Sequence, residues 1–234
     1  MRYKGVFFDL DGTLLPVDLE EFIARYIEAL TAKVAPHVEP QRFRKALLES
    51  TAKMMNNDGS RTNEEAFMEA FFARVDIEPR ELVPVFEDFY RREYRLLGRG
   101  IQARPEARRA VELAAAGGAQ VVLATNPLFP RMAVEVRLEW AGLDAFPFRH
   151  ITTYENSRYC KPNPGYYADI LAATGLRGEE CLMVGNDTLE DLAAAELGFD
   201  TFLLEDFLIE RGYPHAPTWR GGWGDLLDVL TGNG

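Results

Sequence analysis

Cysteine and histidine are scarce in this chain of 234 residues, which contains two cysteines and three histidines. Cys160 and Cys181 do not form a Cys-x-x-Cys pair, and two cysteines in a chain of this length make no disulfide framework. The histidines are scattered, without the close spacing of zinc ligands. So little cysteine is typical of a protein in a reducing cytosol, and we expect a cytoplasmic location.

Basic residues are also fewer than acidic ones. The chain has 26 lysines and arginines against 37 aspartates and glutamates, and its formal net charge is −11. Because nucleic acids and anionic membranes bind basic surfaces, we expect neither as a partner. A small anionic substrate remains possible, since local charge and a metal ion can attract it. No apolar run is long enough to span a bilayer, and no signal peptide precedes the first expected strand.

The composition is otherwise typical of a globular protein, with 47% hydrophobic and 27% charged residues. A chain of this length suits one large domain, or one domain that carries a sizeable insertion. We find no internal repeat and no low-complexity tract in the sequence.

Two aspartates follow the first apolar run, which covers residues 5–8 and is typical of a short buried strand. The sequence Asp-Leu-Asp-Gly-Thr comes directly after it. Because residues two apart in a strand point to the same side, Asp9 and Asp11 lean into one small space. Like charges so close need a cation or a shared proton. The pattern therefore indicates a metal-assisted, carboxylate-based active site at the carboxyl end of a strand, where α/β sheets bind ligands.

The segment 16–100 is predicted to be almost entirely helical. Its first helix follows Asp18, an N-cap candidate, and its second covers residues 40–55. A third begins at Thr62 or Asn63, where Glu65 completes a capping box. A fourth carries Val85, Phe89, Tyr90 and Leu96 and ends near Gly98.

From residue 101 onward strands and helices alternate, which predicts right-handed βαβ units and a parallel sheet covered on both faces. We therefore predict an α/β fold: a Rossmann-like, doubly wound core of residues 1–15 and 101–234, with an all-helical domain of residues 16–100 inserted. The expected strands are 120–125, 149–153, 181–184 and 201–204, and the expected helices are 105–116, 129–141, 163–174, 188–197 and 226–230.

Several polar residues follow the expected strands or precede the helices of this core. Thr125 and Asn126 follow one strand, where a hydroxyl and backbone N–H groups can hold a phosphate oxygen. Lys161 precedes a helix, and Asp187 follows the next strand, with Asp191 one helical turn later. Each has an ordinary interpretation by itself, as a turn residue, a solvated lysine or a helix N-cap.

Taken in order, these motifs resemble those of the haloacid dehalogenase-like (HAD) hydrolase superfamily. Asp-x-Asp-Gly-Thr, strand-Thr, Lys-Pro and strand-Gly-Asn-Asp with a later Asp all occur, and they span residues 9–191. Four motifs on the appropriate elements make a specific pattern. The resemblance implies a phosphatase with a Rossmann-like core, an alpha-helical cap and a Mg²⁺ cofactor, and a small phosphorylated substrate.

The resemblance also implies a role for each matching residue. Asp9 is expected to be the nucleophile that becomes a phospho-aspartate, and Asp11 the general acid and then the general base. Thr125, with the backbone of Asn126, would bind the transferring phosphoryl group. Lys161 would neutralise charge around the nucleophile and the phosphate.

The metal site implied by the resemblance combines a carboxylate of Asp9, the main-chain carbonyl of Asp11 and the carboxylate of Asp187. This chain has Gly-Asn-Asp where the family commonly has Gly-Asp. Asn186 is therefore a candidate second ligand or supporting residue, and Asp191 is expected to support either Lys161 or the metal.

The helical segment 16–100 resembles the family's cap, which closes over the active site and supplies specificity groups. Arg25, Arg61 and Tyr94 are candidate cap contacts. Phosphatase activity is the leading hypothesis, and a phosphomutase on the same scaffold or a non-catalytic phosphate-binding module are the alternatives. A dehalogenase needs no acid at position 11, so Asp11 disfavours it. The sequence alone leaves the substrate and the oligomeric state open.

Overall fold

Six parallel strands form one sheet in the computed structural model, which describes residues 2–212 and 216–232. The order is β3-β2-β1-β4-β5-β6, so that the first strand lies inside the sheet, between β2 and β4. The chain builds outward from β1 on one side and then on the other, which confirms the doubly wound α/β fold. The strands are β1 (Gly5–Phe8), β2 (Gln120–Leu123), β3 (His150–Ile151), β4 (Cys181–Gly185), β5 (Asp200–Leu204) and β6 (Trp219–Gly221).

Helices cover both faces of the sheet because the side chains of β1 alternate between two apolar clusters. Val6 and Phe8 pack in the cluster that contains residues of α6, α7 and α9, whereas Phe7 packs with Tyr167 of α8. The helices of the core are α6 (Pro105–Ala116), α7 (Arg131–Trp140), α8 (Pro164–Thr174) and α9 (Trp223–Thr231), with 3₁₀ helices η1 (Gly178–Glu180) and η2 (Leu192–Leu197).

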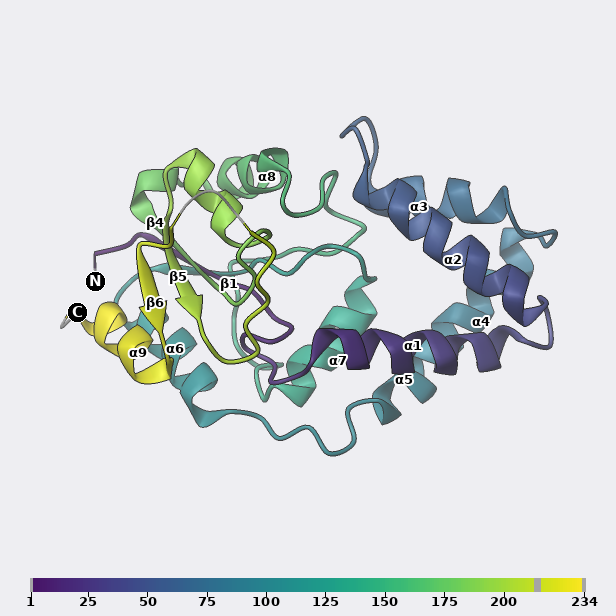
Figure 1. Cartoon of the computed structure of the whole chain (residues 1–234), viewed down its shortest axis with the longest axis horizontal. Helices are drawn as coiled ribbons and strands as arrows, with labels where there is room; N and C mark the ends of the chain where they lie inside the picture. The colour runs from purple at the N-terminus through teal and green to yellow at the C-terminus, as the bar shows by residue number, and fades with distance from the viewer. Residues whose placement is uncertain (1, 213–215, 233–234) are drawn as a thin grey trace.

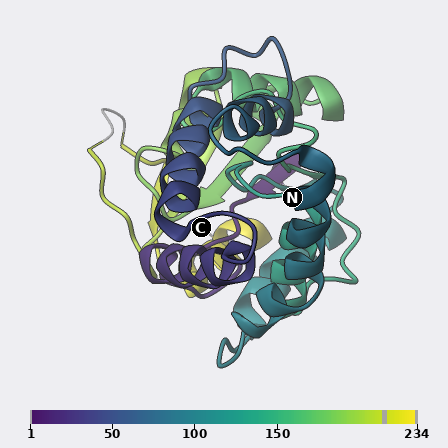
Figure 2. The same cartoon turned by 90° about the vertical axis from the view of Figure 1, so that its right-hand side faces the viewer.

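Six helices follow β1 before the chain returns to the sheet at β2, and the first five of them lie together on one side of the core (Figure 1). After a quarter turn, these helices face the viewer with the sheet behind them (Figure 2). We call residues 16–100 the helical insertion. Its helices are α1 (Leu19–Val34), α2 (Pro40–Met55), α3 (Asn63–Phe72), α4 (Pro79–Arg91) and α5 (Glu93–Leu96).

The caps expected from the sequence form at two of these helices. Asp18 accepts a hydrogen bond from the backbone N–H of Glu21 at the start of α1. Thr62 and Glu65 make both bonds of the capping box at the start of α3. Each cap satisfies N–H groups that have no partner inside the helix, which fixes where the helix begins.

Helix α3 also attaches the helical insertion to the core through Asn63, which is fully buried. The backbone N–H of Asn63 donates to the carbonyl of Ser157, and the next N–H donates to the carbonyl of Tyr154. The Asn63 side-chain amide lies 3.3 Å from the carbonyl oxygen of Tyr159 and 3.3 Å from the sulfur of Cys160. These bonds hold the start of α3 against the loop that leads to Lys161.

Four element predictions need correction. The helix expected over 188–197 is wrong, because only a 3₁₀ helix over Leu192–Leu197 forms after a turn. The strand expected over 149–153 shortens to His150–Ile151 at the sheet edge. The fourth helix of the insertion is two helices, since the backbone turns at Arg92. Strand β6 was not predicted.

None of the helices in residues 2–212 and 216–232 combines the length and the hydropathy needed to cross a membrane.

Candidate active site

The polar residues that follow β1, β2 and β4 meet at one edge of the sheet. Asp9 follows β1, Thr125 lies just beyond β2, and Asp187 lies just beyond β4. Because these three strands are parallel neighbours, their carboxyl ends lie side by side. All three residues line one cavity of about 180 Å³, together with Asp11 and Asn126. We call it the catalytic cavity.

A buried lysine joins two of the carboxylates that line this cavity. The Nζ atom of Lys161 lies 2.9 Å from Oδ1 of Asp9 and 2.7 Å from Oδ1 of Asp191. Burial lowers the pKa of Lys161, but the two carboxylates outweigh this effect and leave its pKa raised. Burial also raises the pKa of Asp9, although the charge of Lys161 opposes the change. Lys161 therefore stays charged and holds the Asp9 carboxylate in place.

Asp191 supports Lys161 and the start of the next loop rather than facing open space. Its second oxygen accepts a hydrogen bond from the backbone N–H of Asp187 at 3.0 Å. A side chain at position 185 would meet this carboxylate, because a Cβ atom on Gly185 would lie 2.0 Å from Oδ2 of Asp191. Position 185, at the end of β4, thus requires glycine, because the carboxylate of Asp191 packs against the backbone there.

Asp11 pairs with Arg137, a residue that the sequence analysis did not select. Arg137 lies on α7, is fully buried and donates to Oδ2 of Asp11, and its guanidinium lies 4.3 Å from the ring centre of Phe129. Burial raises the pKa of Asp11, and the charge of Arg137 opposes that rise. The other oxygen of Asp11 is buried without a hydrogen-bond partner among the described residues.

A second arginine, Arg211 from the segment after β5, lines the catalytic cavity. The Nε atom of Arg211 lies 3.0 Å from Oδ2 of Asp187, and its Nη1 atom lies 3.0 Å from Oε1 of Glu190. The other oxygen of Asp187 accepts from the N–H groups of Leu189 and Glu190. Asp187 thus caps the turn after β4, although no α-helix follows it, and it also lines the cavity.

Asn186 joins the glycine-containing turn that follows β1 to the end of β4. Its Oδ1 accepts from the hydroxyl of Thr13 at 2.9 Å, and its Nδ2 donates to the carbonyl of Phe207 at 2.7 Å. Gly12 has φ +83°, and a Cβ atom there would lie 2.4 Å from Nδ2 of Asn186. Both ends of the Asn186 amide are therefore occupied, which makes it a positioning residue in this structure.

Hydrogen bonds hold Thr125 and Asn126, which both line the catalytic cavity. Thr125 is buried, and its carbonyl accepts from the hydroxyls of Thr152 and Tyr166. The Asn126 amide donates to Oε2 of Glu190 at 2.9 Å, and its oxygen accepts from the N–H of Lys161. These bonds fix the backbone that the sequence analysis expects to contact a phosphoryl group.

The groups around the catalytic cavity suit a Mg²⁺ ion. Across the described ranges, no three Asp, Glu, His or Cys side chains converge to hold a metal by themselves. The expected set needs only the carboxylates of Asp9 and Asp187 and the carbonyl of Asp11, because Mg²⁺ keeps water and phosphate as its other ligands. Both carboxylates line the cavity, and the unpartnered oxygen of Asp11 lies beside them. These hard oxygen donors fit the ion.

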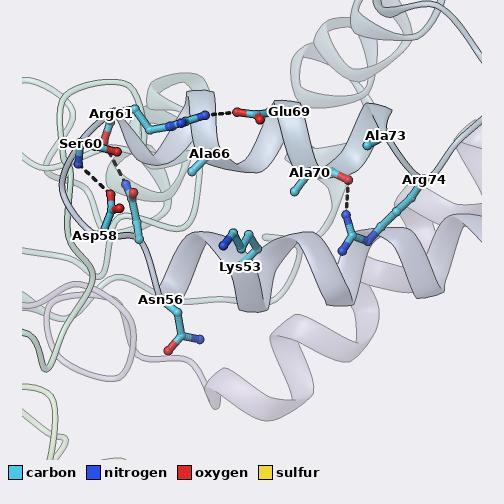
Figure 3. Close-up of a pocket in the computed structure, with 11 residues that line it drawn as sticks. Lys53, Asn56, Asp58, Ser60, Arg61, Ala66, Glu69, Ala70, Ala73 and Arg74 are labelled. Atoms are coloured by element: carbon cyan, nitrogen blue, oxygen red, sulfur yellow. Dashed lines mark hydrogen bonds and ion pairs between the residues drawn. The ribbon is translucent and has the colours of Figure 1, made fainter.

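None of the three candidate cap contacts lines the catalytic cavity. Arg25 donates to the carbonyl of Leu97, and Arg61 pairs with Glu69 on the rim of a separate cavity between α2 and α3 (Figure 3). That cavity has a volume of about 440 Å³, and none of its described lining residues lines the catalytic cavity. Tyr94 is fully buried, and Arg137 and Asp11 both affect its pKa, which burial raises.

Cys160 is an ordinary buried loop residue beside Lys161. Burial raises the pKa of its thiol to about 12, with a smaller contribution from the charge of Glu190. The sulfur accepts from the amide of Asn63, so this thiol packs the loop and is not activated.

Sequence reasoning missed Arg137, Glu190 and Arg211. Glu190 lies inside the fourth motif and could have been found there, because it directly precedes Asp191. Arg137 lies on an amphipathic helix, and Arg211 follows the last long strand. Only the tertiary fold brings these two arginines to the carboxylates, so their local sequence gives no signal.

The comparisons with known proteins agree with this geometry. A family model for haloacid dehalogenase-like hydrolases matches residues 3–198, and the chain belongs to this family. It is therefore a hydrolase of the haloacid dehalogenase-like type. Among curated proteins no sequence matches the chain at a significant level.

Solved structures with the same fold include enzymes of two kinds. A predicted phosphoglycolate phosphatase from Haemophilus somnus 129pt has a TM-score of 0.60, 17% identity and coverage of 98% of both chains. A HAD phosphatase from Thermococcus onnurineus has a TM-score of 0.58, 20% identity and the same coverage. An L-2-haloacid dehalogenase from Xanthobacter autotrophicus has a TM-score of 0.59 and 17% identity, over 99% of this chain and 100% of that chain. At these identities the likeness establishes the fold alone.

Proposed function

We propose that the protein is a Mg²⁺-dependent phosphatase that hydrolyses a small phosphorylated metabolite through a phospho-aspartate on Asp9. The observation that carries this proposal is the carboxylate of Asp11, which lines the same cavity as Asp9 and is bound by buried Arg137. An alcohol needs a proton as it leaves, and Asp11 can donate it. A halide leaves without a proton, so a dehalogenase has no use for this acid.

In the first step, an oxygen of Asp9 attacks the phosphorus atom and the bond to the leaving oxygen breaks. Asp11 gives its proton to that oxygen, and the alcohol departs. In the second step, Asp11 takes a proton from water, which attacks the same phosphorus atom. The bond between phosphorus and Asp9 breaks, inorganic phosphate leaves, and both aspartates return to their starting forms.

The remaining polar groups stabilise charge during these steps. Lys161 holds Asp9 at 2.9 Å and offsets negative charge near the phosphoryl oxygens. The Thr125 hydroxyl and the backbone N–H of Asn126 bind those oxygens. Bound Mg²⁺, held by Asp9, Asp187 and the carbonyl of Asp11, would supply the positive charge that offsets repulsion between carboxylate and phosphate.

The helical insertion is proposed to be the cap of this enzyme, and residues 1–15 and 101–234 its core domain. Leu19 and Ile23 of α1 and Met55 of α2 line the catalytic cavity beside the strand-end aspartates. Helices from the insertion therefore form part of the wall where a substrate would lie. Such a cap excludes water from the reacting groups and selects the leaving group.

The test is phosphate release from p-nitrophenyl phosphate and a panel of sugar, nucleotide and glycolate phosphates. We expect turnover with Mg²⁺ and its loss with a chelator. Asp9→Asn should abolish turnover, and Asp11→Asn should lower it by at least about 100-fold, the usual contribution of a general acid. Asp228→Asn on exposed α9 is the control for neutralising a carboxylate.

Chloride release from L-2-chloropropionate, measured on the same preparations, separates phosphatase from dehalogenase. Halide release without Mg²⁺, or phosphate release that survives Asp9→Asn, would contradict the proposal. Transfer of phosphate between two positions of one sugar would instead assign the scaffold to a phosphomutase. Folded, metal-loaded protein with no turnover on either panel would favour a binding module.

A further inference from the structure

Two more cavities lie between the helical insertion and the core, and the first of them adjoins the catalytic cavity. The first has a volume of about 110 Å³ and shares Ile23, Leu128 and Phe129 with the catalytic cavity. The second has a volume of about 220 Å³ and shares Tyr26 and Phe67, among others, with the first. We call them the inner apolar cavity and the outer cavity. The three therefore follow one another, away from the reacting carboxylates.

The inner apolar cavity offers a ligand little except apolar contact. Every described residue that lines it is uncharged, and its polar side chains are three tyrosines and Thr51. The hydroxyls of Tyr26 and Tyr90 lie 2.8 Å apart and bind each other, and the Thr51 hydroxyl donates to the carbonyl of Leu47. Tyr154 is hydrogen-bonded to Glu64. Because each of these groups already has a partner, the hydroxyls of a sugar would lose bonds to water with few replacements.

The charged side chains that line the outer and catalytic cavities oppose an anionic leaving group. Glu64, Glu87 and Glu155 line the outer cavity, and no described lysine or arginine lines either the inner apolar or the outer cavity. In the catalytic cavity, Arg211 is bound to Asp187 and Glu190. A second carboxylate or phosphate on the substrate would therefore meet like charges and no free cation.

Two exposed apolar side chains of α2 lie beside the inner apolar and catalytic cavities. Leu48 is 56% exposed and lines the inner apolar cavity, and Met55 is 43% exposed and lines the catalytic cavity. They are seven residues apart on one helix and so share a face. Large apolar side chains left exposed beside a pocket are typical of a surface that a ligand covers.

We propose that the leaving group of the substrate is an uncharged apolar group, an aromatic ring or a short alkyl chain, that fills the inner apolar cavity and extends into the outer cavity. The proposal rests on the proposed phosphatase function and specifies its substrate class. A dry cavity of about 150 Å³ can hold benzene, and the inner and outer cavities together exceed that volume. The phosphoryl group then lies at Asp9, and carboxylate-bearing esters such as phosphoglycolate are poor substrates.

Binding of non-hydrolysable phosphonates tests this proposal separately from turnover. Isothermal titration with Mg²⁺ would compare benzylphosphonate, methylphosphonate and phosphonoacetate. We expect benzylphosphonate to bind at least tenfold more tightly than either of the others. Leu48→Lys, and as a second variant Thr51→Lys, place a cation beside the inner apolar cavity and should weaken benzylphosphonate at least fivefold without changing methylphosphonate.

The matched control is Ala52→Lys, which adds the same charge at an exposed position on α2 and should leave all three affinities unchanged. Equal or tighter binding of phosphonoacetate would overturn the proposal, as would unchanged benzylphosphonate binding in folded Leu48→Lys and Thr51→Lys. If p-nitrophenyl phosphate is hydrolysed but benzylphosphonate has no advantage, only the leaving-group proposal fails. If no phosphonate binds and nothing is hydrolysed, the proposed function fails with it.

Discussion

At the scale of single residues, the ion pair with Arg137 fixes the orientation of Asp11, the proposed general acid. A fully buried guanidinium is costly to desolvate, so it needs the charge of a partner in return. Its contact with one oxygen of Asp11 leaves the other oxygen for a substrate or water. We therefore propose that Arg137 is a positioning residue, which acts on the proposed reaction through Asp11.

The substitution Arg137→Met tests this role. We expect kcat to fall by about 10- to 100-fold, part of the usual contribution of an acid–base group, because Asp11 loses its fixed orientation. KM should stay within about twofold, since Arg137 does not line the catalytic cavity. Steady-state kinetics on a hydrolysed ester would measure both constants.

Arg137→Lys keeps the charge and should recover part of kcat. Arg137→Met also leaves a buried carboxylate without its partner, a change that costs about 3–5 kcal/mol when one member of a buried pair is removed. Adding Asp11→Asn should return most of that stability in thermal melts. A raised KM with unchanged kcat would show that Arg137 binds substrate instead.

The sequence predicted the residues of the motifs far better than their partners. Asp9, Thr125 and Asp187 follow strands that a run of apolar residues makes visible, and parallel strands must bring their ends together. Arg137 and Arg211 lie outside any motif, and their positions depend on how α7 and the segment after β5 pack. Such contacts between residues far apart in the chain leave no local pattern.

At the scale of elements, the start of α3 links the helical insertion to the loop that carries Lys161. Asn63→Ala removes an amide that contacts the carbonyl of Tyr159 and the thiol of Cys160. Because buried acceptors then lose their donor, we expect a loss of about 1–3 kcal/mol in the free energy of unfolding. Thermal melts should show a Tm lower by about 2–4 °C for each kcal/mol.

The control is Asn56→Ala, since Asn56 is exposed and its amide donates within α2. It should change Tm by no more than about 1 °C, as most surface substitutions are nearly neutral. A Tm of Asn63→Ala equal to that of Asn56→Ala would mean that these contacts do not hold the insertion to the core.

The bounds of a helix were predicted well where its capping residues and its apolar periodicity agree. Helix α2 (Pro40–Met55) has the predicted bounds because a proline starts it and an Asn-rich turn ends it. The segment after Asp187 has apolar residues at helical spacing, yet it forms a turn and a 3₁₀ helix. Asp187 and Asp191 bind backbone and Lys161 there, and these bonds outweigh the local preference for an α-helix.

At the scale of the whole molecule, the net charge of −11 acts on any phosphate ester that approaches. A dianionic substrate is repelled at long range, and salt screens this repulsion because the Debye length falls to about 10 Å at 0.1 M. We therefore expect KM for a phosphate ester to fall about two- to threefold between low salt and about 0.2 M KCl. Kinetics at constant free Mg²⁺ would measure it.

In the same titration, kcat should stay constant, because the reacting groups are buried and screened little by salt. A KM that rises with KCl would instead mean that a local positive field attracts the substrate despite the negative net charge.

The position of β1 inside the sheet also has a consequence for biosynthesis. This strand is synthesised before its partners Gln120–Leu123 and Cys181–Gly185, which are made more than a hundred residues later. At about 5–20 residues per second, the strand waits several seconds for them. The helical insertion, whose helices pack on one another, can form in the meantime. A nascent chain stalled before residue 120 is therefore expected to expose an unpaired apolar strand and to need protection from chaperones.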